Sequence, residues 1–265
     1  MNKLLGQHFL TDPTVASQMV ALAQLQKGEV VLEVGPGRGV LTARLLATGT
    51  RILAVEKDPK LVAFLTQRFA AVKNLKIVAG DILTCLPSVT GSLKNYIVVA
   101  NIPYYLTARL LRLLLENKNQ PRKIVLMVQK EVAQRIVARP PKSSLLSVAV
   151  QFFGQPKIEF LVPAKKFRPA PKVDSAVISI SPHQVRARGA DWQKHFFWLL
   201  RGGFAQPRKT LGNNFKALLK KDRIEILKWL NRCGVRPTQR AQELSLSSWV
   251  CLAQKLKTKG QGSKI

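Results

Sequence analysis

Short apolar runs recur along the first half of the chain, and helical spacing of apolar residues follows them. Residues 30–34, 51–56 and 96–100 are rich in Val, Ile, Leu and Ala. After the first run, the segment LTARLLA places apolar residues three and four apart. Strands that alternate with helices predict an α/β fold around a parallel sheet.

Polar residues stand at or near the ends of successive runs, at Glu33, Glu56, Asp81 and Asn101. Their separations of 23, 25 and 20 residues match one strand plus one helix. We therefore expect them to line one rim of the sheet and one pocket. An acidic residue about twenty positions past a glycine turn can accept hydrogen bonds from ribose hydroxyls, so Glu56 is the predicted ribose ligand, and Asp81 could accept from an adenine amine. A helix cap or a surface carboxylate is the alternative at any one of these positions.

A glycine-rich turn with Gly35, Gly37 and Gly39 follows the first run. A dinucleotide site favours the spacing G-x-G-x-x-G, but position 40 is Val, and Pro36 removes an N–H that would face a pyrophosphate. The turn suits the close approach of the methionine half of S-adenosylmethionine better. A purely structural turn between strand and helix is the alternative interpretation.

The tetrapeptide Asn101-Ile102-Pro103-Tyr104 predicts chemistry on an amino group of a nucleobase. The lone pair of such an amine is delocalised into the ring, so a catalyst must orient it. The Asn101 amide oxygen and the Ile102 carbonyl can accept its two N–H bonds, Pro103 stiffens the loop, and Tyr104 offers a ring for stacking. An Asn-Pro turn after a strand would be the interpretation if this tetrapeptide stood alone.

A basic, proline-rich loop, AKKFRPAPK, joins two further predicted strands, KIEFLVP and VDSAVISISP. It places Phe167 among cations, which favours an unpaired base and its phosphates, although a core Phe at a strand end fits equally well. Residues 144–153 fit either a helix or a strand. Near the start of the chain, Asp12 before Pro13 predicts a helix start. The candidate RNA contacts in the loop are Lys165, Lys166, Arg168 and Lys172.

The composition changes after Pro182. Residues 186–265 contain 18 Lys and Arg against 4 acids, whereas residues 1–185 contain 25 against 10. The later segments have helical spacing, so we predict a methyltransferase domain over residues 1–185, a basic helical RNA-binding domain over 186–257 and a disordered tail over 258–265. Arg208 and Lys209 are the candidate RNA contacts of the helical domain.

The net charge of +29 indicates a nucleic-acid partner. A membrane surface is the weaker alternative, because the sequence shows no basic helix with a clean apolar stripe for insertion. Cys85, Cys233 and Cys251 have no metal-ligand spacing, nor do the three histidines. From this scatter we expect no metal, no disulfide framework and a reducing cytoplasm. The first residues are too short an apolar stretch for a signal peptide, and no run is long enough to span a membrane.

Several motifs in order resemble those of the ribosomal RNA adenine N6,N6-dimethyltransferases of the small ribosomal subunit. They span roughly residues 5 to 220 and are GQHFLTDP, LEVGPGRGVLT, AVEKD, AGDIL, ANIPYYLT, FRPAPKVDSAV and FAQPRKTLGNN. The resemblance implies a seven-stranded, Rossmann-like class I methyltransferase sheet followed by a small all-helical domain. It also implies dimethylation of two adjacent adenosines near the 3′ end of small-subunit ribosomal RNA, with S-adenosylmethionine as cofactor and a role in small-subunit biogenesis.

The same resemblance assigns site residues. The implied cofactor contacts are Gln7, His8, Leu10, Gly35, Gly37, Glu56, Asp81, Ile82 and Asn101, and Phe167 is a second aromatic residue near the target base. Two positions depart from the family pattern, which usually has Asn in place of His8 and a small polar residue or Asn in place of Tyr105.

The expected partner is small-subunit ribosomal RNA or the immature small subunit. The protein is expected to act as a monomer. Two alternatives stay open. One is a large-subunit RNA methylase of the antibiotic-resistance type, against which the basic segment Pro207–Thr210 argues. The other is a catalytically idle assembly factor, against which the intact Glu56, Asp81 and Asn101 argue.

Overall fold

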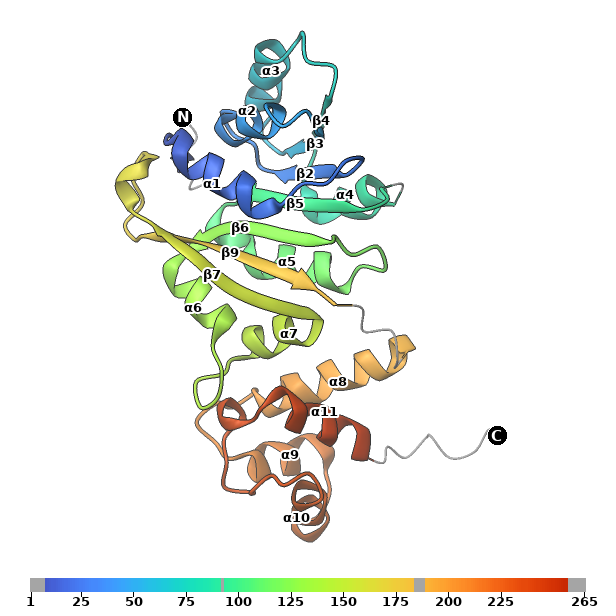
Figure 1. Ribbon diagram of the computed structural model, residues 1–265. Coiled ribbons are helices and arrows are strands. Elements are labelled where there is room, and N and C mark those ends of the chain that lie inside the picture. Colours follow the sequence, from blue (N-terminus) through green and yellow to red (C-terminus); the bar gives the residue numbers. More distant parts are fainter. Residues whose placement is uncertain (1–7, 92, 184–188, 257–265) are drawn as a thin grey trace. The chain divides into compact units, whose positions relative to one another are not determined.

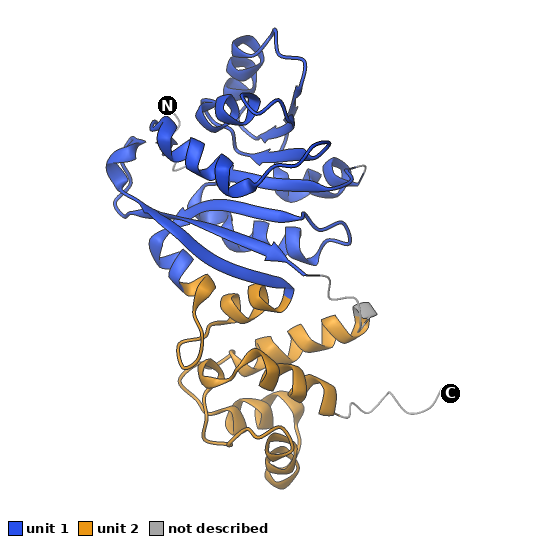
Figure 2. Cartoon of the chain, viewed as in Figure 1, with its two compact units in different colours: residues 1–134, 153–183 blue, residues 135–152, 184–265 orange. Residues whose placement is uncertain are grey.

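The computed structural model describes residues 8–91, 93–183 and 189–256. The chain forms two compact units, one of residues 1–134 and 153–183 and the other of residues 135–152 and 184–265 (Figure 2). The predicted division at residue 185 and the predicted tail over 258–265 both lie outside the described residues. The segment 135–152, which we had assigned to the first domain, groups with the second unit.

The first unit is built on a seven-stranded sheet (Figure 1). Its strand order is β4-β3-β2-β5-β6-β9-β7. The five strands from β4 to β6 run parallel, whereas β9 is antiparallel to β6 and β7 is antiparallel to β9. This confirms the expected methyltransferase sheet. The bounds are β2 (Val30–Val34), β3 (Arg51–Glu56), β4 (Leu75–Ala79), β5 (Tyr96–Asn101), β6 (Lys123–Gln129), β7 (Gly154–Val162) and β9 (Ser175–Pro182).

Helices precede, connect or follow the parallel strands, and aspartates begin three of them. The predicted start at Asp12 is confirmed, because its carboxylate accepts hydrogen bonds from the N–H groups of Thr14 and Val15. Asp58 and Asp81 cap the next two such helices in the same way. The helices are α1 (Pro13–Ala23), α2 (Val40–Leu46), α3 (Pro59–Arg68), α4 (Ile82–Thr90), α5 (Thr107–Glu116), α6 (Lys130–Val137) and α7 (Leu145–Phe153). Residues 145–153, whose sequence fits either a helix or a strand, form the helix α7.

The core of the first unit lies between the sheet and its helices. On one face α1 contributes Val15, Ala16, Met19 and Ala23, which pack with α2 against apolar side chains of the central strands. Burial of an aliphatic side chain of this kind stabilises a fold by roughly 1.5–3 kcal/mol. The sheet is therefore held rigidly beneath the loops at its carboxyl edge.

Besides α7, the second unit contains the four remaining long helices, which confirms the expected C-terminal helical region. Trp249 is fully buried, and its ring lies 5.6 Å from that of Phe204 and 6.2 Å from that of Phe215. A Cβ at Gly203 would meet a Trp249 ring atom at 2.3 Å, so glycine is needed for this close packing. The helices are α8 (Gly189–Gly203), α9 (Leu211–Leu219), α10 (Arg223–Asn231) and α11 (Leu246–Lys255).

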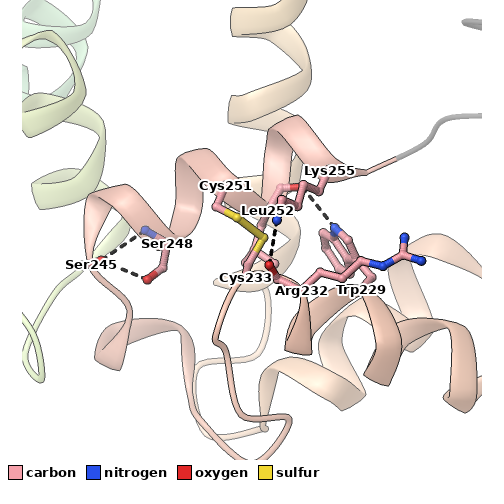
Figure 3. Close-up of a disulfide and its surroundings, with 8 residues drawn as sticks. All are labelled: Trp229, Arg232, Cys233, Ser245, Ser248, Cys251, Leu252 and Lys255. Carbon is pink, nitrogen blue, oxygen red and sulfur yellow. Dashed lines mark hydrogen bonds between the residues drawn. A yellow bond between two sulfur atoms is a disulfide. The ribbon is translucent and has the colours of Figure 1, made fainter.

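A disulfide joins Cys233 to Cys251, whereas the scatter of the cysteines had predicted no disulfide framework (Figure 3). The two residues are 18 positions apart, but packing of α10 against α11 brings their Cα atoms to 5.8 Å, within the range for a disulfide. Nearby, the Trp229 indole N–H donates to the Leu252 carbonyl at 3.1 Å. The sequence argument considered spacing alone and missed this tertiary approach, so the cysteines no longer support a reducing compartment. Cys85 is free.

The described residues contain neither a candidate metal cluster nor a candidate membrane-spanning helix. No group of three or more His, Cys, Asp or Glu side chains there could hold a metal ion. No helix within the same residues combines the length and the apolar character needed to cross a membrane.

Candidate active site

A cavity lies at the carboxyl ends of β2, β3 and β5, in the first unit. The strand order reverses between β2 and β5, and in open α/β sheets such a reversal leaves a crevice for ligands. The cavity is lined by His8, Phe9, Leu10, Glu33, Gly35, Pro36, Gly37, Arg38, Val40, Leu41, Glu56, Leu61, Asn101, Ile102, Pro103, Tyr104 and Phe167. Most of the predicted site residues are therefore brought together.

The glycine turn forms one wall of the cavity. Gly37 has a φ of +60°, and a Cβ at this position would lie 3.1 Å from the Phe9 ring. Glycine is thus required both by the backbone conformation and by the close approach of Phe9. The Gly37 N–H also donates to the Glu56 carboxylate at 3.2 Å, which ties the turn to the end of β3.

Glu56 is buried, with 5% of its surface exposed, and its carboxylate is held by backbone N–H groups. One oxygen, Oε1, accepts from Lys57 N and Asp58 N, both at 2.9 Å, and the other, Oε2, accepts from Gly37 N. A carboxylate has about four acceptor positions, so Oε2 can still accept from a hydroxyl group. The predicted ribose ligand is therefore fixed in position and retains acceptor capacity toward the cavity.

Asp81 and Ile82 do not line this cavity in the part of the chain that the structure describes. The Asp81 carboxylate accepts from Leu83 N at 2.9 Å and forms an ion pair with Lys57 Nζ at 2.8 Å. The hydrogen bond from Lys57, followed by that from Leu83, holds the pKa of Asp81 below its usual value. Gln7, the other predicted cofactor contact, lies outside the described residues.

The tetrapeptide that begins at Asn101 forms another wall of the cavity. Asn101 is the last residue of β5, Ile102 is buried, and Tyr104 starts a short 3₁₀ helix, η2 (Tyr104–Leu106). The Tyr104 hydroxyl lies 3.0 Å from the Ser175 hydroxyl, and burial raises the pKa of the phenol. Its ring stacks with that of His8, with 6.1 Å between centroids.

A two-stranded ribbon borders the cavity on the side of the chain's N-terminal segment. It pairs β1 (Phe9–Leu10) antiparallel with β8 (Phe167–Arg168), so that Leu10 faces Phe167. The His8 Nδ1 atom lies 2.8 Å from the Pro169 carbonyl, which can only accept, so Nδ1 donates. Phe167 is 2% exposed, belongs to the core cluster and also lines the cavity. The two interpretations of Phe167 are thus compatible.

The predicted RNA contacts lie in different surroundings. Lys166, in η3 (Ala164–Lys166), forms an ion pair with Asp12. Arg208 and Lys209 belong to the second unit, where they are exposed immediately before α9. The remaining three are also exposed, namely Lys165, Arg168 and Lys172.

Sequence reasoning did not assign several residues that line the cavity. Arg38 lies with its guanidinium 5.2 Å from the centroid of the Phe9 ring, a cation–π arrangement that only the fold creates. Glu33 was expected at this pocket from the spacing of the polar strand ends but was given no role there, although it is the one charged residue in the buried run VVLEV. A carboxylate inside such a run indicates a functional or structural role, since burying an unpaired charge costs free energy.

Comparison with known proteins gives a consistent result. A family model described as ribosomal RNA adenine dimethylase matches residues 1–258. A protein of Dehalococcoides mccartyi, named ribosomal RNA small subunit methyltransferase A, is 41% identical over 251 residues, which cover 94% of this chain and 86% of the relative. A protein of Rippkaea orientalis with the same name is 39% identical over 270 residues and covers 97% of both chains.

Solved structures share the fold. A dimethyladenosine transferase from Plasmodium falciparum superimposes with a TM-score of 0.78 at 24% identity, covering 92% of this chain and 96% of that one. The 23S rRNA methyltransferase ErmE gives 0.74 at 24% identity, covering 94% and 99%. At this identity the likeness concerns the architecture.

Proposed function

Because the chain belongs to the ribosomal RNA adenine dimethylase family, we propose that it dimethylates the N6 amines of two adjacent adenosines near the 3′ end of small-subunit ribosomal RNA, using S-adenosylmethionine. The observation that carries this proposal is the single cavity that unites the glycine turn, the fixed Glu56 carboxylate and the Asn101–Tyr104 loop. A nucleoside-bearing methyl donor and an amine acceptor would meet there. The reaction supports biogenesis of the small subunit.

The residues of the cavity fit the cofactor. S-adenosylmethionine, when bound, supplies a methyl group on a positively charged sulfur. The glycine turn lets the backbone come close to a ligand, and Glu56 accepts from ribose hydroxyls through Oε2. His8 and Leu10 line the cavity from β1 and the residue before it. For Asp81 to accept from the adenine amine, its carboxylate must give up or share the contact with Lys57.

The Asn101–Tyr104 loop orients the target amine. In our proposal, the Asn101 amide oxygen and the Ile102 carbonyl accept its two N–H bonds and so direct the nitrogen lone pair into the cavity. These acceptors stabilise the positive charge that develops on nitrogen as the bond to carbon forms, and hence no strong general base is required. Tyr104, held at its hydroxyl by Ser175, and Phe167 provide aromatic faces for the unpaired base.

RNA is held by cations outside the cavity. Exposed Lys165, Arg168 and Lys172 follow or precede Phe167 in the chain, where they can meet phosphates next to the stacked base. Lys166 contributes only after its ion pair with Asp12 opens. Arg208 and Lys209 add phosphate contacts from the helical unit. We propose that residues 186–257 act as an RNA-binding domain. We also propose that the protein works as a monomer.

The large-subunit alternative is less well supported. The relatives at about 40% identity are named for the small subunit, whereas ErmE, named for 23S RNA, is 24% identical. An idle assembly factor would have no need to keep Glu56, Asn101 and the glycine turn around one cavity.

The proposal is tested by mass mapping of methylated adenosines after the protein is incubated with unmethylated small subunits and labelled cofactor. We expect four methyl groups per particle, two on each of two adjacent adenosines. Label on large-subunit RNA, or on a base other than adenine, would overturn the assignment. The Asn101→Ala protein provides the background signal.

A further inference from the structure

An exposed ion pair lies at the carboxyl ends of β3 and β4, where the proposed function gives a role to only one of its partners. Lys57 directly follows β3, and its Nζ atom donates to Asp81 Oδ2 at 2.8 Å. The other oxygen, Oδ1, accepts from Leu83 N. The Lys57 side chain is 58% exposed and that of Asp81 is 32% exposed. Lys57 can therefore change its partner without any opening of the core.

Two further side chains face this ion pair from the segment after Asn101. Tyr105 is 64% exposed, which makes it the most exposed of the described Phe, Tyr and Trp residues. Arg109, in the first turn of α5, is also exposed. Neither Tyr105 nor Arg109 has a hydrogen-bond or ion-pair partner among the described residues. Both groups are thus available to a ligand.

Electrostatic effects place these two side chains near the ion pair. Asp81 is the main cause of the raised pKa of Lys57, and Tyr105 adds to that rise. Lys57 in turn is the main cause of the lowered pKa of Asp81, to which Arg109 also contributes. An exposed ring between cations is the arrangement by which proteins hold a base and its phosphate in single-stranded RNA.

We propose that Tyr105, Arg109 and Lys57 form a binding subsite for an RNA nucleotide that flanks the target adenosine, and that Lys57 moves from Asp81 to a phosphate of this RNA when the cofactor is bound. Tyr105 directly follows Tyr104, the proposed stacking partner of the target base, so a neighbouring nucleotide is within reach. The inference rests on the proposed function, because it requires Asp81 to accept from the adenine amine of S-adenosylmethionine.

Competition for the Asp81 carboxylate couples the two ligands. Without RNA, the adenine amine must displace Lys57 or share the carboxylate with it. An RNA phosphate gives Lys57 another anionic partner, which leaves Asp81 free to accept from the cofactor. The reverse also holds, since an adenine on Asp81 frees Lys57 for the phosphate. By linkage, each ligand must strengthen the binding of the other by the same factor.

Binding of the wild-type protein to unmethylated small subunits, with and without saturating S-adenosylhomocysteine, measures this coupling. This ligand keeps the adenine but has no methyl group to transfer. We expect roughly fivefold tighter binding in its presence, at the low end of the range for coupled sites. The slope of log affinity against log salt should also steepen by about 0.7–0.9, because one more phosphate is contacted. Both comparisons use the wild-type protein only.

Variants of Lys57 identify the group that moves. Lys57→Met should abolish both the coupling and the change in salt slope. Without RNA it should bind S-adenosylhomocysteine at least as tightly as the wild type, because the competitor for Asp81 is gone. Lys60→Met, at an exposed lysine of α3, is the matched control and should keep both effects. Weaker cofactor binding by Lys57→Met would contradict the exchange.

Variants of Tyr105 test the subsite itself. Tyr105→Ala should weaken binding to the small subunit roughly fivefold or more, with or without S-adenosylhomocysteine, because one base–aromatic stack is lost. Tyr105→Phe should bind like the wild type, since stacking needs the ring and not the hydroxyl. Full binding by Tyr105→Ala would remove the subsite.

The outcomes separate this inference from the proposed function. If the wild-type protein binds both ligands but with the same RNA affinity and salt slope in either state, the exchange of Lys57 is overturned while the proposed function stands. If the wild-type protein neither binds S-adenosylhomocysteine nor methylates the small subunit, the proposed function fails as well.

Discussion

The cavity of the first unit and the basic surface of the second differ in how their functional groups are held. Around the cavity, Glu56 is fixed by three backbone N–H groups and Tyr104 by Ser175. Arg208 and Lys209, by contrast, are exposed in a turn. Chemistry needs each group in one position, whereas phosphate binding adds up over many flexible cations. Single substitutions should therefore have large effects in the first region and small effects in the second.

The largest effect is expected at Asn101. Its amide is proposed to act on the reacting nitrogen, and loss of one positioned group of this kind typically reduces a rate by roughly 10²- to 10³-fold. Asn101→Ala should show this loss in single-turnover methylation, with RNA binding nearly unchanged. Asn213→Ala, an exposed amide on α9, is the control. Near-normal rates for Asn101→Ala would remove the amide from the mechanism.

Reduction of the disulfide should destabilise the second unit while leaving the cavity intact. Closing a loop of 18 residues is expected to stabilise by about 3 kcal/mol. Chemical denaturation with and without reductant measures the change, and Cys233→Ser with Cys251→Ser should reproduce the reduced form. Cofactor affinity is expected to be the same in all three. A loss of cofactor affinity on reduction would mean that the two regions are not independent.

Glu56→Ala should weaken cofactor binding by about 1.5–3 kcal/mol, because it removes a charge-assisted acceptor. The neighbouring N–H groups of Gly37, Lys57 and Asp58 also lose their partner. Calorimetry with S-adenosylmethionine measures the loss, and Glu116→Ala is the surface control. Unchanged affinity would exclude Glu56 from the site.

The smallest effect is expected from the double variant Arg208→Ala and Lys209→Ala. Each phosphate contact contributes a slope of about −0.7 to −0.9 in the dependence of log affinity on log salt. The variant should bind the ribosomal particle more weakly and with a flatter slope, at unchanged cofactor affinity. Arg51→Ala with Lys76→Ala removes the same charge from the first unit, at exposed positions of β3 and β4. If the salt slope of the Arg208/Lys209 variant equals that of the wild type, the RNA phosphates are bound elsewhere on the protein.

Much of the fold could be predicted because its signals are local. Asp12 before Pro13 specifies a helix start by itself, and the runs that end at Glu56 and Asn101 specify strands whose carboxyl ends meet. Residues 145–153 were ambiguous because LLSVAVQFF is mostly apolar, so neither period stands out.

The features that escaped prediction are contacts between distant segments. Cys233 and Cys251 meet only once α10 and α11 pack together, and Lys166 pairs with Asp12 across more than a hundred and fifty residues. Glu33 was visible as a charge in an apolar run, but its lack of a partner emerges only from the folded sheet. Such pairings depend on tertiary structure, which spacing along the chain does not encode.

One single-turnover titration tests whether catalysis and RNA binding depend on different regions of the protein. The methylation rate is measured against the concentration of small subunits at saturating cofactor. Asn101→Ala should lower the limiting rate at the same half-saturating concentration, and the Arg208/Lys209 variant should raise the half-saturating concentration at the same limiting rate. If both variants changed the same parameter, the division of labour between the two regions would be contradicted.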